Sequence, residues 1–151
     1  MFDRIVVPTD GSELAEKAVD RAIEYCRRVG ASMTTVYVRP TNPMEEVKTL
    51  NDYGTSVIPI VTPEAIEHAE RHAREMLQRV ADRARDQGVE CATAIVANDQ
   101  PYRGIIELAE QQSGSLIFIA SHGRGGMEAL LLGSVTQKVL AHSKIPVLVF
   151  R

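Results

Sequence analysis

The sequence predicts an α/β fold: an open, parallel, five-stranded sheet with helices on both faces, of the Rossmann-like type. Two observations lead to this prediction. Short, almost wholly apolar runs alternate with longer amphipathic segments along the chain, which is the pattern of strands buried between two helical layers. The length of 151 residues is that of one domain, and a hydrophobic share of 44% gives such a domain enough apolar surface for a core.

The chain begins with a predicted strand, helix and second strand. Arg4–Pro8 is a nearly all-apolar run, as expected for a strand covered on both faces. Ser12 predicts the start of a helix that ends near Gly30, because its hydroxyl can accept a free amide of the first turn. Met33–Arg39 is the second predicted strand, so this part of the chain forms a βαβ unit.

The next segment, Thr41–Thr62, has no sustained hydrophobic period. It contains prolines, a glycine and an asparagine, which favour turns. Because a structureless loop of this length is uncommon inside a compact domain, we expect it to be functional, partly structured or mobile. One hypothesis is that part of it closes over a bound ligand as a lid.

The remaining elements continue the alternation of helix and strand. Thr62 predicts the cap of a long helix that has Pro63 at its first position and Gly88 at its end. The later predicted elements are, in chain order, a strand over Val89–Ala97, a helix that starts at Asp99 and Pro101 and runs to Gln111, a strand over Leu116–Ala120, a glycine-rich loop over Ser121–Gly133 with a helical stretch at Met127–Leu132, a helix over Ser134–His142 and a strand over Val147–Phe150.

The composition argues against several classes of partner. Seventeen Lys and Arg against twenty Asp and Glu give a net charge of -3 and a pI of about 5.8, without the basic excess of a nucleic-acid-binding protein. The longest apolar runs are far shorter than the ~20 residues of a membrane helix, and the N-terminus has no signal-peptide pattern. Cys26 and Cys91 have the wide spacing of reduced, cytosolic thiols. We therefore expect a cytoplasmic protein with no nucleic-acid and no membrane partner.

In an open parallel sheet, ligands bind beyond the carboxyl ends of the strands, where the strand order reverses. Three segments follow predicted strands in this way: Pro8–Ser12, Val38–Pro40 and Ser121–Ser134. The last is rich in glycine, which lets backbone amides approach an anion closely. It also contains the basic Arg124 and leads into a helix whose free amides favour phosphate. The alternative is a flexible loop capped by Ser134.

Two motifs at opposite ends of the chain resemble signatures of the universal stress protein family. The first is Ile5–Ser12 (IVVPTDGS), which resembles the N-terminal signature of that family. The second is Ser121–Gly125 (SHGRG) together with Leu131–Thr136 (LLGSVT) and Ile145–Val149 (IPVLV), which resembles its C-terminal signature. The resemblance covers essentially the whole chain and implies the fold of the adenine nucleotide alpha hydrolases.

The nucleotide-binding branch of that family is marked by G-x2-G-x9-G-[S/T]. Gly123, nine intervening residues and Gly133-Ser134 match the later part of this motif. Ala120 occupies the position of the first glycine, where an added methyl is either accommodated or crowds the base or ribose. Because family members without this pattern generally do not bind ATP, a stress protein that binds no nucleotide and acts through protein partners is the alternative.

Carried over residue by residue, the resemblance implies an adenine-nucleotide site for ATP, or for AMP or ADP. Asp10 would lie near the ribose or a metal-bound phosphate, and Mg²⁺ or Mn²⁺ would bridge the phosphate oxygens. The implied contacts are Pro8, Thr9 and Asp10 on the adenine and ribose, the backbone of Val38 on adenine, Ala120, Gly123 and Arg124 beside the ribose and phosphates, and Gly133, Ser134, Val135 and Thr136 on the phosphate tail.

Each polar candidate also has a purely structural explanation. Asp10 could support the N-terminus of the first helix, where negative charge is favourable. His68 and His72 have a spacing that can bind metal, but the acidic residues around them favour a solvated helix face. His122 has no visible partner acid, so a loop or phosphate contact is favoured over general-base chemistry. Cys26 lies on an apolar stripe and is expected in the core.

The predicted function is that of a nucleotide-binding regulator or switch in the stress response, with no catalytic residues and unknown regulatory protein partners. The alternatives are a slow ATP hydrolase or another nucleotide-hydrolysing or adenylylating enzyme, and a receiver-like phosphorylation domain, for which the acids are poorly placed. The terminal apolar strand invites pairing with another copy, and the family resemblance also implies a homodimer. Its predicted interface is Val147, Leu148, Val149 and Phe150.

Overall fold

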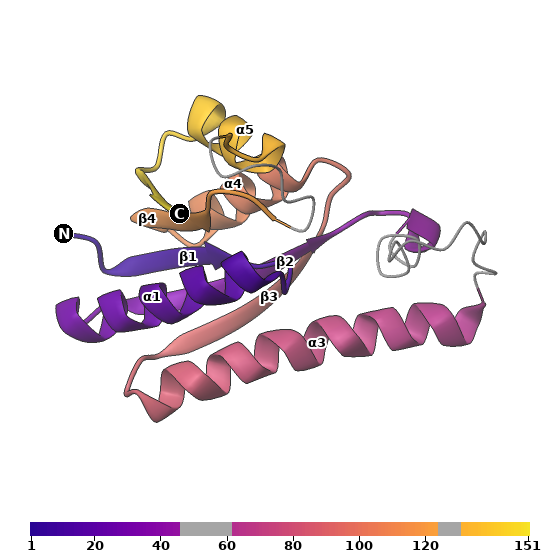
Figure 1. Cartoon of the computed structure of the whole chain (residues 1–151), viewed down its shortest axis with the longest axis horizontal. Coiled ribbons are helices and arrows are strands. Elements are labelled where there is room, and N and C mark those ends of the chain that lie inside the picture. Colours follow the sequence, from indigo (N-terminus) through magenta and orange to yellow (C-terminus); the bar gives the residue numbers. More distant parts are fainter. Residues whose placement is uncertain (46–61, 124–130) are drawn as a thin grey trace.

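The computed structural model describes residues 1–45, 62–123 and 131–151, which form a parallel sheet covered by helices (Figure 1). The sheet has the strand order β3-β2-β1-β4-β5. All the strand pairs are parallel, which confirms the predicted α/β fold. The strands are β1 (Arg4–Pro8), β2 (Ser32–Arg39), β3 (Cys91–Ala97), β4 (Leu116–Ala120) and β5 (Val147–Phe150).

The strand order reverses beside β1. From β1 the chain builds outward through β2 to β3, then crosses to the other side of β1 for β4 and continues to β5. Val6 of β1 is therefore in register with Thr34 of β2 on one side and with Ile117 of β4 on the other. A reversal of this kind opens a crevice at the carboxyl ends of the two central strands.

Helix boundaries follow the capping residues expected from the sequence. The hydroxyl of Ser12 accepts the amide of Ala15, and that of Thr62 accepts the amide of Ala65. Gly30 ends the first helix with a φ of +70°, a backbone conformation that favours glycine. The helices are α1 (Glu13–Val29), α3 (Pro63–Asp86), α4 (Pro101–Gln111) and α5 (Ser134–His142), and residues 43–45 form a short helical turn.

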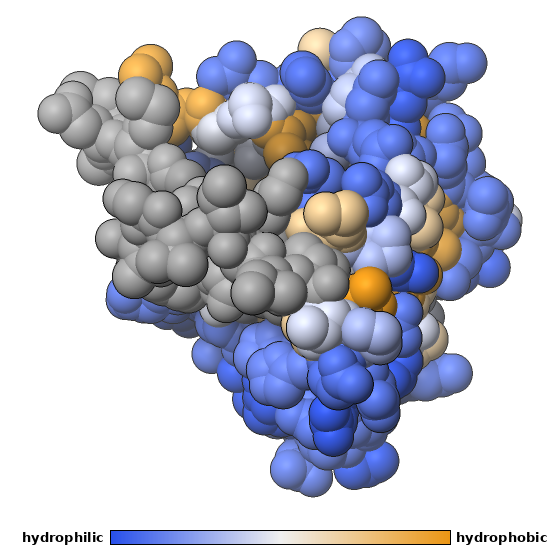
Figure 2. Space-filling model, turned by 90° about the vertical axis from the view of Figure 1, so that its right-hand side faces the viewer, coloured by the Kyte–Doolittle hydropathy of each residue, from blue (hydrophilic) through white to orange (hydrophobic). Residues whose placement is uncertain are grey.

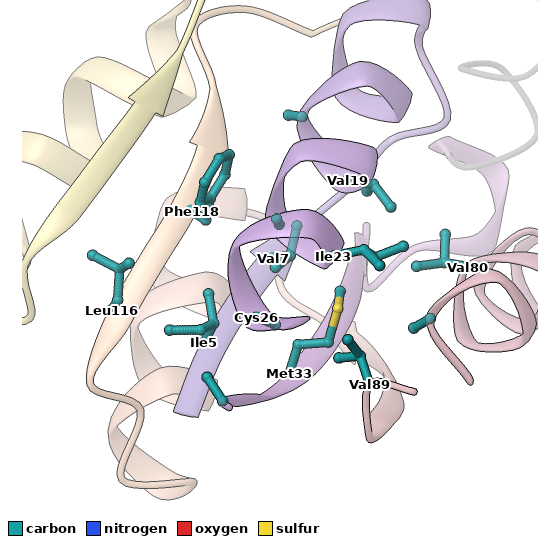
Figure 3. Close-up of a cluster of buried hydrophobic side chains, with 14 of the residues drawn as sticks. Ile5, Val7, Val19, Ile23, Cys26, Met33, Val80, Val89, Leu116 and Phe118 are labelled. Carbon is teal, nitrogen blue, oxygen red and sulfur yellow. The ribbon is translucent and has the colours of Figure 1, made fainter. Parts of the chain in front are cut away.

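Two apolar layers hold the helices on the sheet. Ile5 and Val7 of β1 pack on one face with α1 and α3, whereas Val6 packs on the other face with α4 and α5. Figure 3 shows the first layer, in which Cys26 of α1 lies among aliphatic side chains and is fully buried. The predicted core position of Cys26 is thus confirmed. No helix among the described residues is long and apolar enough to cross a membrane.

At two predicted boundaries, hydrogen bonds that the sequence pattern does not show decide where the element begins. Strand β3 starts at Cys91 rather than Val89, since the amide of Val89 donates to the carbonyl of Ala84 and closes the end of α3. Helix α4 starts at Pro101, and Asp99 instead accepts hydrogen bonds from Thr41. The proposed lid lies largely outside the described residues, as does most of the helical stretch predicted at Met127–Leu132.

Candidate nucleotide site

A cavity of about 670 Å³ lies at the carboxyl ends of β1, β2 and β4, where the strand order reverses. Figure 2 views this edge of the sheet, where apolar residues reach the surface within a largely hydrophilic face. Arg124 is outside the described residues. All the other residues predicted to bind nucleotide line this one cavity: Pro8, Thr9, Asp10, Val38, Ala120, Gly123, Gly133, Ser134, Val135 and Thr136.

The turn after β1 forms the floor of the cavity. The amide of Thr9 donates to the carbonyl of Val36 on the neighbouring strand, over 2.9 Å. The Oγ1 of Thr9 accepts the amide of Gly11, and the Oδ1 of Asp10 accepts the amide of Ser12 over 2.9 Å. Asp10 therefore shapes the start of α1, as its structural explanation expects, and at the same time lines the cavity.

The glycines of the C-terminal motif allow loops to pack without side chains between them. A Cβ at Gly123 would overlap the carboxylate of Asp10, so the loop after β4 lies directly on the loop after β1. A Cβ at Gly133 would come within 3.0 Å of the Cα of His122, and the amide of Gly133 donates to the carbonyl of Ser121 over 2.7 Å. Both glycines thus permit close backbone approach at the cavity wall.

The N-terminus of α5 opens on the cavity without a side-chain cap. Its N-cap residue is Gly133, no side chain makes a capping hydrogen bond, and its first turn contains no acidic residue. Helices α1 and α3, by contrast, each have a hydroxyl cap and an acidic first turn. The first amides of a helix and its dipole favour an anion, so α5 presents a surface suited to phosphate.

Thr136 and Ala120 are joined by a hydrogen bond that attaches α5 to β4. The hydroxyl of Thr136, which is 2% exposed, donates to the carbonyl of Ala120 over 2.8 Å. The side chain of Ala120 belongs to the core layer on the α1 side, together with Ala15 and Phe118. Ala15 and Ala120 both line the cavity. The methyl group that replaces the first glycine of the motif is therefore part of an apolar wall.

A further wall, from the start of α4, was missed by the sequence analysis. Pro101 and Ile105 of α4 line the cavity together with Val36 and Val38 of β2. Gly104 lets α4 pack closely on this strand, because a Cβ there would come within 2.9 Å of Val38. A glycine in the interior of a predicted helix is the sequence signal that could have indicated this contact, since glycine is unfavourable there without a packing reason.

The acidic side chain of Asp99 connects two loops beside the cavity. The Oδ1 of Asp99 accepts the amide of Thr41 over 2.8 Å and its hydroxyl over 2.7 Å. These bonds lower the pKa of Asp99 below its usual range, and the bond from the Thr41 hydroxyl has the larger effect. Pro40 and Pro101, each close in sequence to this contact, both line the cavity. Asp99 thus ties the loop after β2 to the loop before α4.

The other predicted candidates lie apart from the cavity or at its edge. His68 and His72 are exposed on α3, with their ring centroids 6.5 Å apart. Among the described residues, no group of three or more His, Cys, Asp or Glu side chains could hold a metal ion. His122 lines the cavity, and its Nδ1 lies 3.2 Å from the Oγ of Ser121.

Comparison with known proteins shows the family of this chain. The model of the universal stress protein family matches residues 1–151. The chain belongs to the universal stress protein family. Universal stress protein YxiE of Bacillus subtilis is 30% identical to it, over the whole length of both chains. The recognition made from the two terminal motifs is therefore confirmed.

Solved structures of universal stress proteins share the fold. The structure of MJ0577, a universal stress protein of Methanocaldococcus jannaschii, superposes with a TM-score of 0.78 and 26% identity, covering 99% of this chain and 95% of that one. A universal stress protein from Archaeoglobus fulgidus, solved in complex with dAMP, has a TM-score of 0.66 and 23% identity and covers both chains fully. At that identity the second likeness establishes the fold alone.

Proposed function

We propose that this universal stress protein binds an adenine nucleotide, ATP or its products AMP and ADP, in the cavity at the carboxyl edge of its sheet. One observation carries the proposal. Residues from the ends of β1, β2 and β4 and from the start of α5, which the family resemblance assigns to one ligand, line one cavity. The dAMP complex of the Archaeoglobus fulgidus protein is consistent with an adenine nucleotide on this fold.

The walls of the cavity divide into an apolar part and a part suited to anions. Val38, Pro101 and Ile105 offer an apolar surface for the base. The amides at Ser134 and Val135 begin the uncapped helix α5 and suit the phosphates. The predicted Mg²⁺ or Mn²⁺ would accompany the phosphates, as these ions prefer phosphate oxygens.

We further propose that the protein works as a regulator and not as an enzyme, with a second copy as its partner. The cavity-lining carboxylate of Asp10 accepts the amide of Ser12, which makes it a poor general base. Slow hydrolysis of ATP is the second candidate, because bound metal and an oriented water can suffice for it. Turnover above roughly 1 per second, within the usual range of enzymes, would favour that candidate.

Calorimetry with Mg·ATP on nucleotide-stripped protein tests the proposal. We expect saturable binding by the wild-type protein and a loss of about tenfold or more in affinity for Gly123→Ala, whose Cβ overlaps Asp10. His68→Asn, which changes an exposed residue of α3 away from the cavity, is the matched control and should bind as the wild type does.

The absence of heat at high micromolar ATP, with the wild-type protein folded, would overturn nucleotide binding. It would favour the alternative of a stress protein that acts through protein partners alone. Equal affinities for wild type and Gly123→Ala would show that ATP binds elsewhere than in this cavity.

A further inference from the structure

The cavity contains few ionisable side chains for a site that is proposed to hold phosphate. Among its lining residues that the structure describes, Asp10 and His122 are the two whose side chains can be charged near neutral pH. The other described lining residues are apolar or neutral polar. Of these two, His122 is the one that can attract an anion, and it can do so only when its imidazole is protonated.

His122 is held in place by its neighbours. Its Nδ1 lies 3.2 Å from the Oγ of Ser121, a buried residue whose amide donates to the carbonyl of Phe150. Gly133 packs against the backbone of His122, where a Cβ would come to 3.0 Å from the Cα of His122. A protonated imidazole can donate from Nδ1 to the hydroxyl of Ser121 and from Nε2 to a ligand. The contact with Ser121 leaves Nε2 as the ring nitrogen that would meet a ligand.

We propose that His122, in its protonated form, binds a phosphate of the nucleotide, so that nucleotide binding takes up a proton and strengthens as the pH falls. This inference rests on the proposed function and specifies how the same site is regulated. A charge-assisted hydrogen bond to phosphate stabilises the complex more than a neutral one does. Nucleotide occupancy would then rise whenever the surrounding solution becomes more acidic.

One described carboxylate lies close in space to the backbone around His122. Asp10, from the turn after β1, lies against Gly123, the residue that follows His122. Within residues 1–45, 62–123 and 131–151, Ser121, which follows β4, and Gly133, the N-cap of α5, contact His122 and are uncharged. A phosphate bound beside the imidazole would favour its protonated form in the complex, which is why binding would take up a proton.

The test compares AMP, which has a phosphate, with adenosine, which has none, at pH 6.5 and pH 8.0. For the wild-type protein we expect AMP to bind roughly fivefold more tightly at pH 6.5, while the affinity for adenosine stays the same. His122→Gln is neutral at both pH values and should lose the difference. His122→Lys is positive at both and should bind AMP tightly at pH 8.0 as well. Circular dichroism checks that both variants are folded.

A second readout is the heat of binding in buffers of different ionisation enthalpy. Proton uptake makes this heat depend on the buffer, and the dependence should be smaller in His122→Gln. If wild type and His122→Gln show the same ratio of AMP affinities at the two pH values, His122 does not couple binding to protons, and the proposed function stands without it. If the wild-type protein binds neither AMP nor Mg·ATP at either pH, the proposed function fails and this inference fails with it.

Discussion

Cys26 and Cys91 both lie in or against the apolar layer between the sheet and α1 and α3. Burial raises the pKa of the Cys26 thiol to about 11, with a smaller contribution from the nearby Cys91. Burial also raises the pKa of Cys91, against a weaker opposing effect of the Thr35 backbone. Because the thiolate is the reactive form, both thiols are protected by the fold.

The native protein should therefore react slowly with a thiol reagent such as Ellman's reagent at pH 8. A pKa of about 11 in place of 9.0 leaves about 100-fold less thiolate at Cys26, and its burial slows the reaction further. Cys91→Ala isolates Cys26, and the same variant in urea gives the unprotected rate. Equal rates with and without urea would contradict the burial of Cys26. Ionisation of this thiol also makes stability depend on pH. The free energy of unfolding should fall as the pH rises from 9.0 toward about 11, because only the unfolded thiol ionises in that range.

At the residue scale, the sequence identified most of the cavity wall but not the orientation of Ala120. The motif showed that a methyl group replaces a glycine at this position. The face of the strand on which that methyl lies depends on the packing of β4 between α1 and α4, which the sequence pattern does not specify. The structure puts it in the core layer beside Ala15.

At the scale of elements, the helices differ in how their N-termini are capped. Helices α1 and α3 begin with side-chain caps from Ser12 and Thr62, whereas α4 and α5 begin without a side-chain cap. A glycine N-cap leaves amides unsatisfied by side chains, at a cost of roughly a few tenths of a kcal/mol relative to Ser or Thr. A ligand that accepts from those amides offsets this cost, so the start of α5 exchanges stability for an anion site.

Substitutions in the first turn of α5 should separate stability from ligand affinity. Thr136→Val should lower the free energy of unfolding by about 1–2 kcal/mol, because the buried carbonyl of Ala120 loses its donor. Ser134→Ala, at an exposed position, should leave stability nearly unchanged and weaken the binding of Mg·ATP. Urea denaturation and calorimetry measure the two effects. An unchanged urea midpoint for Thr136→Val would show that the bond to Ala120 does not hold α5 in place.

The order and type of the elements could be predicted, since strands buried between two helical layers are apolar throughout and the helices are amphipathic. The sequence was less informative at Val89 and Asp99. Val89 is apolar and suits a strand, but its amide closes the end of α3. Asp99 suits a helix cap, but it accepts from Thr41, which is 58 residues away in the sequence. A long-range partner such as Thr41 leaves no local pattern around Asp99, and the helix-closing role of the Val89 amide is not visible in its apolar side chain.

At the scale of the whole molecule, the sheet ends in two edges, β3 and β5. We predict that the homodimer forms through β5. Val149→Glu should then give a monomer in sedimentation, because a charge on a paired edge opposes its burial. Ile95→Glu, at a 36% exposed position on β3, is the matched control and should remain a dimer. Thermal melting checks that both variants fold, and a dimer of Val149→Glu would refute this interface.

The shape of the cavity was the least predictable property at this scale. The rule that ligands bind at the carboxyl ends of parallel strands predicted that the ends of β1 and β4 would both contribute to the site. The wall from α4 depends on how closely that helix approaches Val38, which a single glycine, Gly104, permits. A pattern of apolar residues predicts which face of a helix is buried, but not the distance between a helix and the sheet.

The reversal of strand order beside β1 has a consequence for folding. The cavity draws one wall from the first two strands of the chain and the opposite wall from the segments that follow β3. A nucleotide bound there, as proposed, would contact both parts of the chain and link them. Its binding free energy would be added to the stability of the complete fold. Depletion of nucleotide would then lower the resistance of the whole chain to unfolding and proteolysis.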